Sequence, residues 1–184
     1  TRLSLDETSL SNGELYTILT NKAAKGQKGV LVAMVKGTKS ESIIEILKRI
    51  PKRLRDKVEE VTLDMASSMN LIVKHCFGKS TKVIDRFHVQ KLAYDALQEM
   101  RIKHRWDAID EESNATDNAR WEKEEYVPFR FENGDTKKQL LARSRYLLFK
   151  SPDKWSHTQK VRAKILFAQY PDIKKAFSLT HSLR

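Results

Sequence analysis

Three strand-like stretches of this chain end on an aspartate. They read Leu3-Ser4-Leu5-Asp6, Val61-Thr62-Leu63-Asp64 and Lys82-Val83-Ile84-Asp85. A carboxylate at the end of an apolar run lies where a buried strand meets solvent, and in open α/β sheets ligands bind at that edge. Carboxylates that converge there repel one another unless a cation or a proton lies between them. The pattern therefore predicts a divalent-metal site at the edge of a sheet.

Asp6 and Asp64 form the leading pair, because both follow an apolar residue, a Ser or Thr and a leucine. Two-metal sites for phosphoryl transfer use carboxylates to hold Mg²⁺ or Mn²⁺ ions about 3.5–4 Å apart, one for the attacking oxygen and one for the leaving oxygen. The alternative for either aspartate alone is that it caps the next turn. Asp85 and His88 could bind a metal or each other, but the residues alone favour a helix-capping aspartate and a packed histidine.

The elements that must position these residues follow from the periodicity. Strand patterns cover 3–10, 14–20 and 30–35, and Asn12-Gly13 predicts a tight hairpin turn between the first two. The continuous apolar run 30–35 predicts a strand buried on both faces. Helical patterns then alternate with two further strands, in the order helix 38–50, strand 58–64, helix 67–77, strand 81–85 and a helix from residue 89.

Three meandering strands followed by strand–helix crossovers predict an α/β fold. This is the order of the ribonuclease-H-like fold, a mixed sheet of a three-strand meander plus two parallel strands, flanked by helices. In that topology the first and fourth strands are neighbours, so Asp6 and Asp64 would lie close together. We therefore expect a partial ribonuclease-H-like core over residues 1–106.

Residues 107–184 form the second predicted part, an acidic, loop-rich segment followed by a basic helical insertion. Residues 107–135 carry 3 Lys and Arg against 10 Asp and Glu, and residues 136–184 carry 12 against 2. Capping boxes are predicted at Thr38 with Glu41 and at Ser156 with Gln159. The basic block is a candidate phosphate-contacting surface, although a solvated helical face has a similar composition. Its candidate DNA-contacting residues are Lys137, Lys138, Arg143, Arg145, Lys160, Arg162 and Lys164.

Composition narrows the class of protein. The 184 residues carry a net charge of +11, which indicates a polyanionic partner. The single cysteine, Cys76, excludes an internal disulfide and fits a reducing compartment. No run approaches the roughly 18 consecutive apolar residues of a membrane span, so no membrane partner is expected.

Three segments resemble one known family. Leu5-Asp6-Glu7-Thr8-Ser9, then Val61-Thr62-Leu63-Asp64-Met65, then Ile84-Asp85-Arg86-Phe87-His88-Val89-Gln90-Lys91 resemble bacterial DDE-type transposases of the L-three insertion-sequence group. A later stretch, Arg145–Pro152, is also similar, and residues 107–135 match poorly.

The resemblance implies a catalytic domain that cuts DNA at transposon ends and joins them to target DNA, in the bacterial cytoplasm, with Mg²⁺ or Mn²⁺ in a two-metal site. By fold position, Asp6 and Asp64 match the first two catalytic carboxylates and metal ligands. Asp85 and His88 match a supporting Cys/Asp-x-x-His motif. A rival alignment makes Asp85 the second catalytic aspartate.

Some parts of the family pattern have no counterpart in the chain. The third carboxylate of the family is a later glutamate, which we expect beyond residue 184, so this piece would be incomplete and inactive alone. The resemblance also implies a homo-oligomer for the full-length protein. Two alternatives remain, namely a ribonuclease-H-like DNA nuclease and a non-catalytic DNA-binding remnant.

Overall fold

The computed structural model describes residues 1–183, and its contacts divide the chain into two compact units. The first unit is Thr1–Val89, and the second begins at Gln90. Each unit has its own hydrophobic core, so we describe them separately. No helix within residues 1–183 is long and apolar enough to cross a membrane.

Within the described residues, five strands of the first unit form one mixed sheet. Its order is β3-β2-β1-β4-β5, with antiparallel pairing among β1, β2 and β3 and parallel pairing of β4 to both β1 and β5. The predicted ribonuclease-H-like fold class is confirmed, including the neighbouring first and fourth strands. The strands are β1 (Arg2–Ser9), β2 (Leu15–Asn21), β3 (Leu31–Lys36), β4 (Glu60–Leu63) and β5 (Thr81–Ile84).

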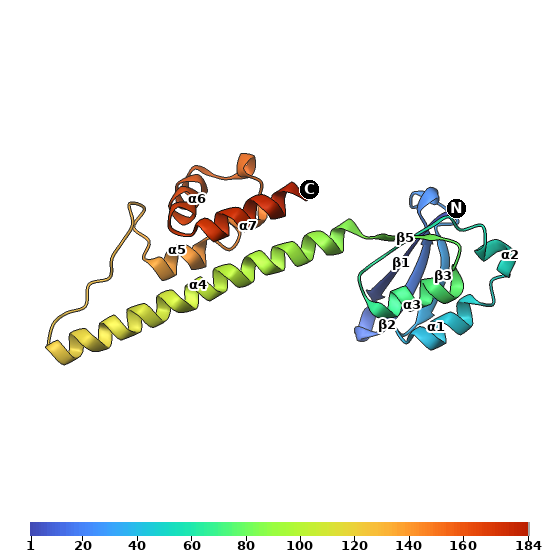
Figure 1. The fold of residues 1–184 in the computed structure, drawn as a ribbon, viewed down its shortest axis with the longest axis horizontal. Coiled ribbons are helices and arrows are strands. Elements are labelled where there is room, and N and C mark those ends of the chain that lie inside the picture. The colour runs from blue at the N-terminus through green and yellow to red at the C-terminus, as the bar shows by residue number, and fades with distance from the viewer. Residues whose placement is uncertain (184) are drawn as a thin grey trace. The chain divides into compact units, whose positions relative to one another are not determined.

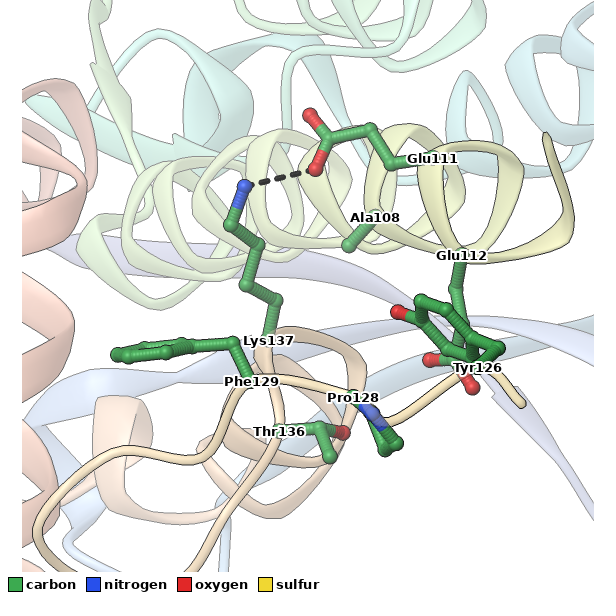
Figure 2. Close-up of a pocket in the computed structure, with 8 residues that line it drawn as sticks. All are labelled: Ala108, Glu111, Glu112, Tyr126, Pro128, Phe129, Thr136 and Lys137. Carbon is green, nitrogen blue, oxygen red and sulfur yellow. Dashed lines mark hydrogen bonds and ion pairs between the residues drawn. The ribbon is translucent and has the colours of Figure 1, made fainter. Parts of the chain in front are cut away.

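Helices α1 and α3 pack on one face of this sheet (Figure 1). Leu3 and Leu5 of β1 are buried in the core beneath them, whereas Asp6 is exposed, as the two-residue period of a strand requires. The core thus fixes which face of β1 carries Asp6. The helices of this unit are α1 (Ser40–Leu47), the short α2 (Lys52–Arg55), α3 (Ser67–Cys76) and the start of α4 (Arg86–Glu122).

Three local predictions for the first unit are wrong. Asp6 does not end its strand, because β1 continues to Ser9. Strand β3 lies at the edge of the sheet, and Leu31, Val32 and Met34 are exposed rather than buried on both faces. An apolar run does not reveal whether both faces of its strand will be covered. The capping box at Thr38 and Glu41 is absent too, because α1 begins two residues later and its N-cap, Lys39, makes no side-chain cap.

The second unit is helical. Its core includes Leu97 of α4 and the fully buried leucines 140, 141, 147 and 148. Residues 107–122, expected to be loop-rich, instead continue the helix α4, and the Ser156–Gln159 capping box is confirmed at the start of α6. After α4 come α5 (Lys137–Arg143), α6 (His157–Gln169), α7 (Pro171–Ser182) and the single-turn elements η3 (Leu147–Phe149) and η4 (Pro152–Lys154).

Candidate active site

The sheet brings Asp6 and Asp64 to the same edge. Strands β1 and β4 pair in parallel, with Ser4 opposite Thr62, and continuing that register by two residues sets Asp6 level with Asp64. Neighbouring strands lie about 4.8 Å apart. Two aspartates separated by 57 intervening residues of sequence therefore lie on adjacent strands at the same level, Asp6 within β1 and Asp64 directly after β4.

Asp85 lies at this edge as well, one strand farther from β1. Leu63 pairs with Ile84 in the β4–β5 ladder, and the Asp85 N–H donates a hydrogen bond of 2.8 Å to the Leu63 carbonyl oxygen. Because β4 separates β5 from β1, Asp85 follows a strand that is not adjacent to the strand of Asp6. This placement agrees with the choice of Asp64 as the partner of Asp6.

Each aspartate uses only one carboxylate oxygen in a backbone hydrogen bond. Oδ1 of Asp6 accepts from the Glu7 N–H at 2.8 Å, and Oδ1 of Asp64 accepts from the Ala66 N–H at 2.8 Å. Within residues 1–183, no lysine or arginine forms an ion pair with Asp6, Asp64 or Asp85. The carboxylates are thus oriented by the backbone but not neutralised by a lysine or an arginine.

The motif Asp85-x-x-His88 does not close on itself. Oδ1 of Asp85 accepts a hydrogen bond of 2.9 Å from the Phe87 N–H, so Asp85 caps the first turn of α4. His88 turns instead toward β1, where its Nε2 lies 3.9 Å from Oδ1 of Asp6, which is within ion-pair range but too long for a hydrogen bond. The helix cap therefore positions a histidine beside the first aspartate.

Glu7 adds a further negative charge that the sequence analysis did not single out. Partial burial raises the pKa of the Glu7 carboxyl above its usual value, and the charges of Asp64 and Asp6 raise it further. The only sequence signal was its position directly after Asp6. The effect of Asp64 and Asp6 on the Glu7 pKa shows that three carboxylates lie close enough to repel one another, and a bound cation would relieve this repulsion.

The carboxylates present fit a magnesium or manganese ion that keeps part of its water shell. Magnesium is usually held by one or two protein carboxylates together with several waters. In the part of the chain that the structure describes, no group of three or more His, Cys, Asp or Glu side chains is placed to hold a metal. If Asp6 and Asp64 bind a metal, they would supply two carboxylates to it.

A comparison with protein families identifies the family of the chain. The model of a DDE-type family of the L-three group, described as transposase, matches residues 3–184. The chain belongs to this transposase family. A search of curated proteins found no match. Transposases of this type typically use divalent metal, and the family implies that the chain binds DNA.

The seven predicted DNA-contacting residues of this transposase all lie in the second unit, and they differ in whether they already bind an acidic side chain. Four already have acidic partners: Lys137 binds Glu111 at 2.7 Å, Lys138 binds Glu112 at 2.6 Å, and both Arg143 and Arg162 bind the buried Asp135. A basic side chain that is paired with a carboxylate attracts a phosphate less strongly than an unpaired one. The other three of the seven, Arg145, Lys160 and Lys164, are exposed and form no ion pair with a carboxylate of residues 1–183.

Proposed function

We propose that this chain is the catalytic part of a transposase that cuts DNA at transposon ends and joins the freed 3′ hydroxyl to target DNA. One observation carries the proposal: Asp6 lies on β1 and Asp64 directly follows the adjacent parallel strand β4, and neither forms an ion pair with a lysine or arginine of residues 1–183. The family match supports transposase function in general, and the metal-dependent steps are our inference.

In this proposal Asp6 and Asp64 hold Mg²⁺ or Mn²⁺ through the carboxylate oxygens that the backbone does not use. Divalent ions bound there would supply Lewis acidity to the attacking and leaving oxygens of the phosphodiester. The rigid strands hold the two carboxylates in place before DNA arrives, which limits the reorganisation needed during reaction. His88, beside Asp6, and the α4 cap at Asp85 support this geometry.

A strand-transfer assay tests the proposal against its two alternatives. The full-length protein is incubated with labelled transposon-end duplexes, a supercoiled plasmid and Mn²⁺, and the products are separated on a gel. We expect end cleavage and joining to the plasmid. Cleavage without joining would favour a nuclease, and DNA binding with neither reaction would favour a non-catalytic remnant.

Assembly of the full-length protein into a homo-oligomer stays a prediction.

The three unpaired basic residues should contribute to the salt dependence of DNA binding. Replacing Arg145, Lys160 and Lys164 with glutamine should weaken DNA binding for all sequences and lower the slope of log Kd against log salt by roughly 1 per residue, because each phosphate contact releases counterions. Fluorescence anisotropy over a salt series measures this slope.

The matched control is the pair Lys137→Gln and Lys138→Gln, since both side chains already bind glutamates. This control should change the slope much less. An equal decrease in both variants would mean that the phosphate-contacting surface is not confined to the unpaired residues.

A further inference from the structure

An exposed aromatic side chain lies next to the candidate site. Phe87 is 68% exposed, although it lies between the helix-capping Asp85 and His88. It belongs to neither hydrophobic core of the described residues. A large ring kept in solvent at this position makes no evident contribution to the stability of the unit, so a binding role has to be considered.

The surrounding residues hold the Phe87 ring against His88, which faces Asp6. Its backbone N–H is bound by Asp85 in the first turn of α4, at 2.9 Å. Its ring packs edge to face with the His88 ring, at 5.6 Å between centroids and an interplanar angle of 86°. His88 in turn lies 3.9 Å from the Asp6 carboxylate. A short chain of direct contacts thus connects the aromatic ring to the proposed catalytic edge.

We propose that Phe87 stacks on a nucleobase that leaves the duplex next to the phosphodiester held at Asp6 and Asp64. The inference rests on the proposed function, and it narrows the substrate to DNA with an unpaired or easily unpaired base beside the reacting phosphate. Bases stack on exposed aromatic rings whatever their sequence, because every base has a π face. A ring adjacent to a phosphate-binding edge is within reach of the base attached to that phosphate.

The competing explanation is that Phe87 is an apolar contact for another protein surface. Two substitutions distinguish base stacking from an apolar protein contact. Leucine preserves an apolar contact but cannot stack on a base, whereas tryptophan preserves stacking. Because Phe87 is exposed and its cap uses only its backbone N–H, these substitutions should leave the fold intact, which circular dichroism and thermal melting check.

The experiment measures binding of the full-length protein to two labelled mixed-sequence duplexes, with Ca²⁺ replacing Mg²⁺ so that cleavage is suppressed. One duplex is fully paired, and the other carries a central mismatch with 2-aminopurine. We expect Phe87→Ala and Phe87→Leu to weaken binding of the mismatched duplex by about 5- to 150-fold and to reduce the change in 2-aminopurine fluorescence that wild-type binding produces. Binding of the paired duplex should change less. Phe87→Trp should behave like the wild type.

Trp121→Ala is the matched control, since Trp121 is also an exposed aromatic residue, 88% exposed, but lies in the second unit. Trp121→Ala should change the binding affinity for neither duplex. Stacking is overturned if Phe87→Leu binds like the wild type, or if Phe87→Ala affects both duplexes equally. If the wild type cuts and joins DNA while every Phe87 variant binds normally, only this inference fails. If the wild type neither binds nor cuts DNA, the proposed function fails with it.

Discussion

Replacing Asp6 or Asp64 with asparagine is expected to lower the rates of DNA cleavage and strand transfer by at least about 10³-fold, or ~4 kcal/mol of transition-state stabilisation. Asparagine keeps the size of the side chain and one oxygen acceptor for the backbone N–H groups of Glu7 and Ala66. It removes the negative charge that we propose holds the metal ion. The fold should therefore persist while the chemistry is lost.

Initial rates of the full-length variants on labelled transposon-end duplexes, with a melting curve for each variant, measure this effect. Asp153→Asn is the matched control, because Asp153 is an exposed aspartate in the second unit. Asp85→Asn tests whether Asp64 or Asp85 is the second catalytic aspartate. If Asp85→Asn abolishes cleavage and Asp64→Asn does not, the rival alignment is correct and our assignment of Asp64 is wrong.

The second large effect is expected in the second unit, where Asp135 holds two arginines together. Its fully buried carboxylate accepts hydrogen bonds from Arg143, from Arg162 Nε at 2.8 Å and from Asn133 Nδ2 at 2.8 Å. Removing both arginines would leave a buried charge with no basic partner. We expect the double variant Arg143→Ala, Arg162→Ala to lose about 3–5 kcal/mol of unfolding free energy.

Tryptophan fluorescence during urea unfolding measures this loss selectively, because the three tryptophans, at 106, 121 and 155, all lie in the second unit. Arg162→Ala alone should cost more than Arg143→Ala, since the Arg162 side chain is 19% exposed and that of Arg143 is 56% exposed. Lys137→Ala, which breaks an exposed pair, is the control and should cost less than about 1 kcal/mol. Equal losses in all variants would contradict a special role for Asp135.

Asp135 also predicts how the second unit responds to acid. Burial alone would raise the pKa of its carboxyl, but hydrogen bonds from Arg162 and Arg143 outweigh burial and lower the pKa below 3.8. A carboxyl whose folded-state pKa is lowered stabilises the fold above its unfolded pKa of about 3.9, and this stabilisation is lost as the pH falls through the folded pKa. Urea midpoints should therefore decrease below about pH 4, and Asp135→Asn should remove this part of the decrease.

Local sequence patterns were sufficient for the elements that carry the site. The alternation of Leu3 and Leu5 with Ser4 and Asp6 predicted a strand with the aspartate on the exposed face, as found. The order of strands and helices matched the ribonuclease-H-like topology, and analogy with that fold predicted that the first and fourth strands are neighbours, as found. The roles of Asp6 and Asp64 stay predictions.

Patterns also misled where burial or length depended on distant parts of the chain. The run 30–35 reads as a fully buried strand, but β3 is an edge strand with three exposed apolar residues. The acidic residues 107–122 show weak periodicity, yet they continue α4 as a helix. Lys137 and Lys138 of α5 bind Glu111 and Glu112 of that helix, an interaction between residues 26 positions apart.

The sequence by itself determined the order of strands and helices in the first unit, the capping box at Ser156 and Gln159, and which family the chain resembles. These properties depend on neighbours a few positions apart. Only the tertiary structure decided that His88 faces Asp6 rather than Asp85, that Phe87 stays exposed beside them, and that Asp135 takes two of the predicted DNA-contacting arginines. Each of these depends on contacts between segments far apart in the chain, and spacing along a single sequence does not encode which distant side chains meet.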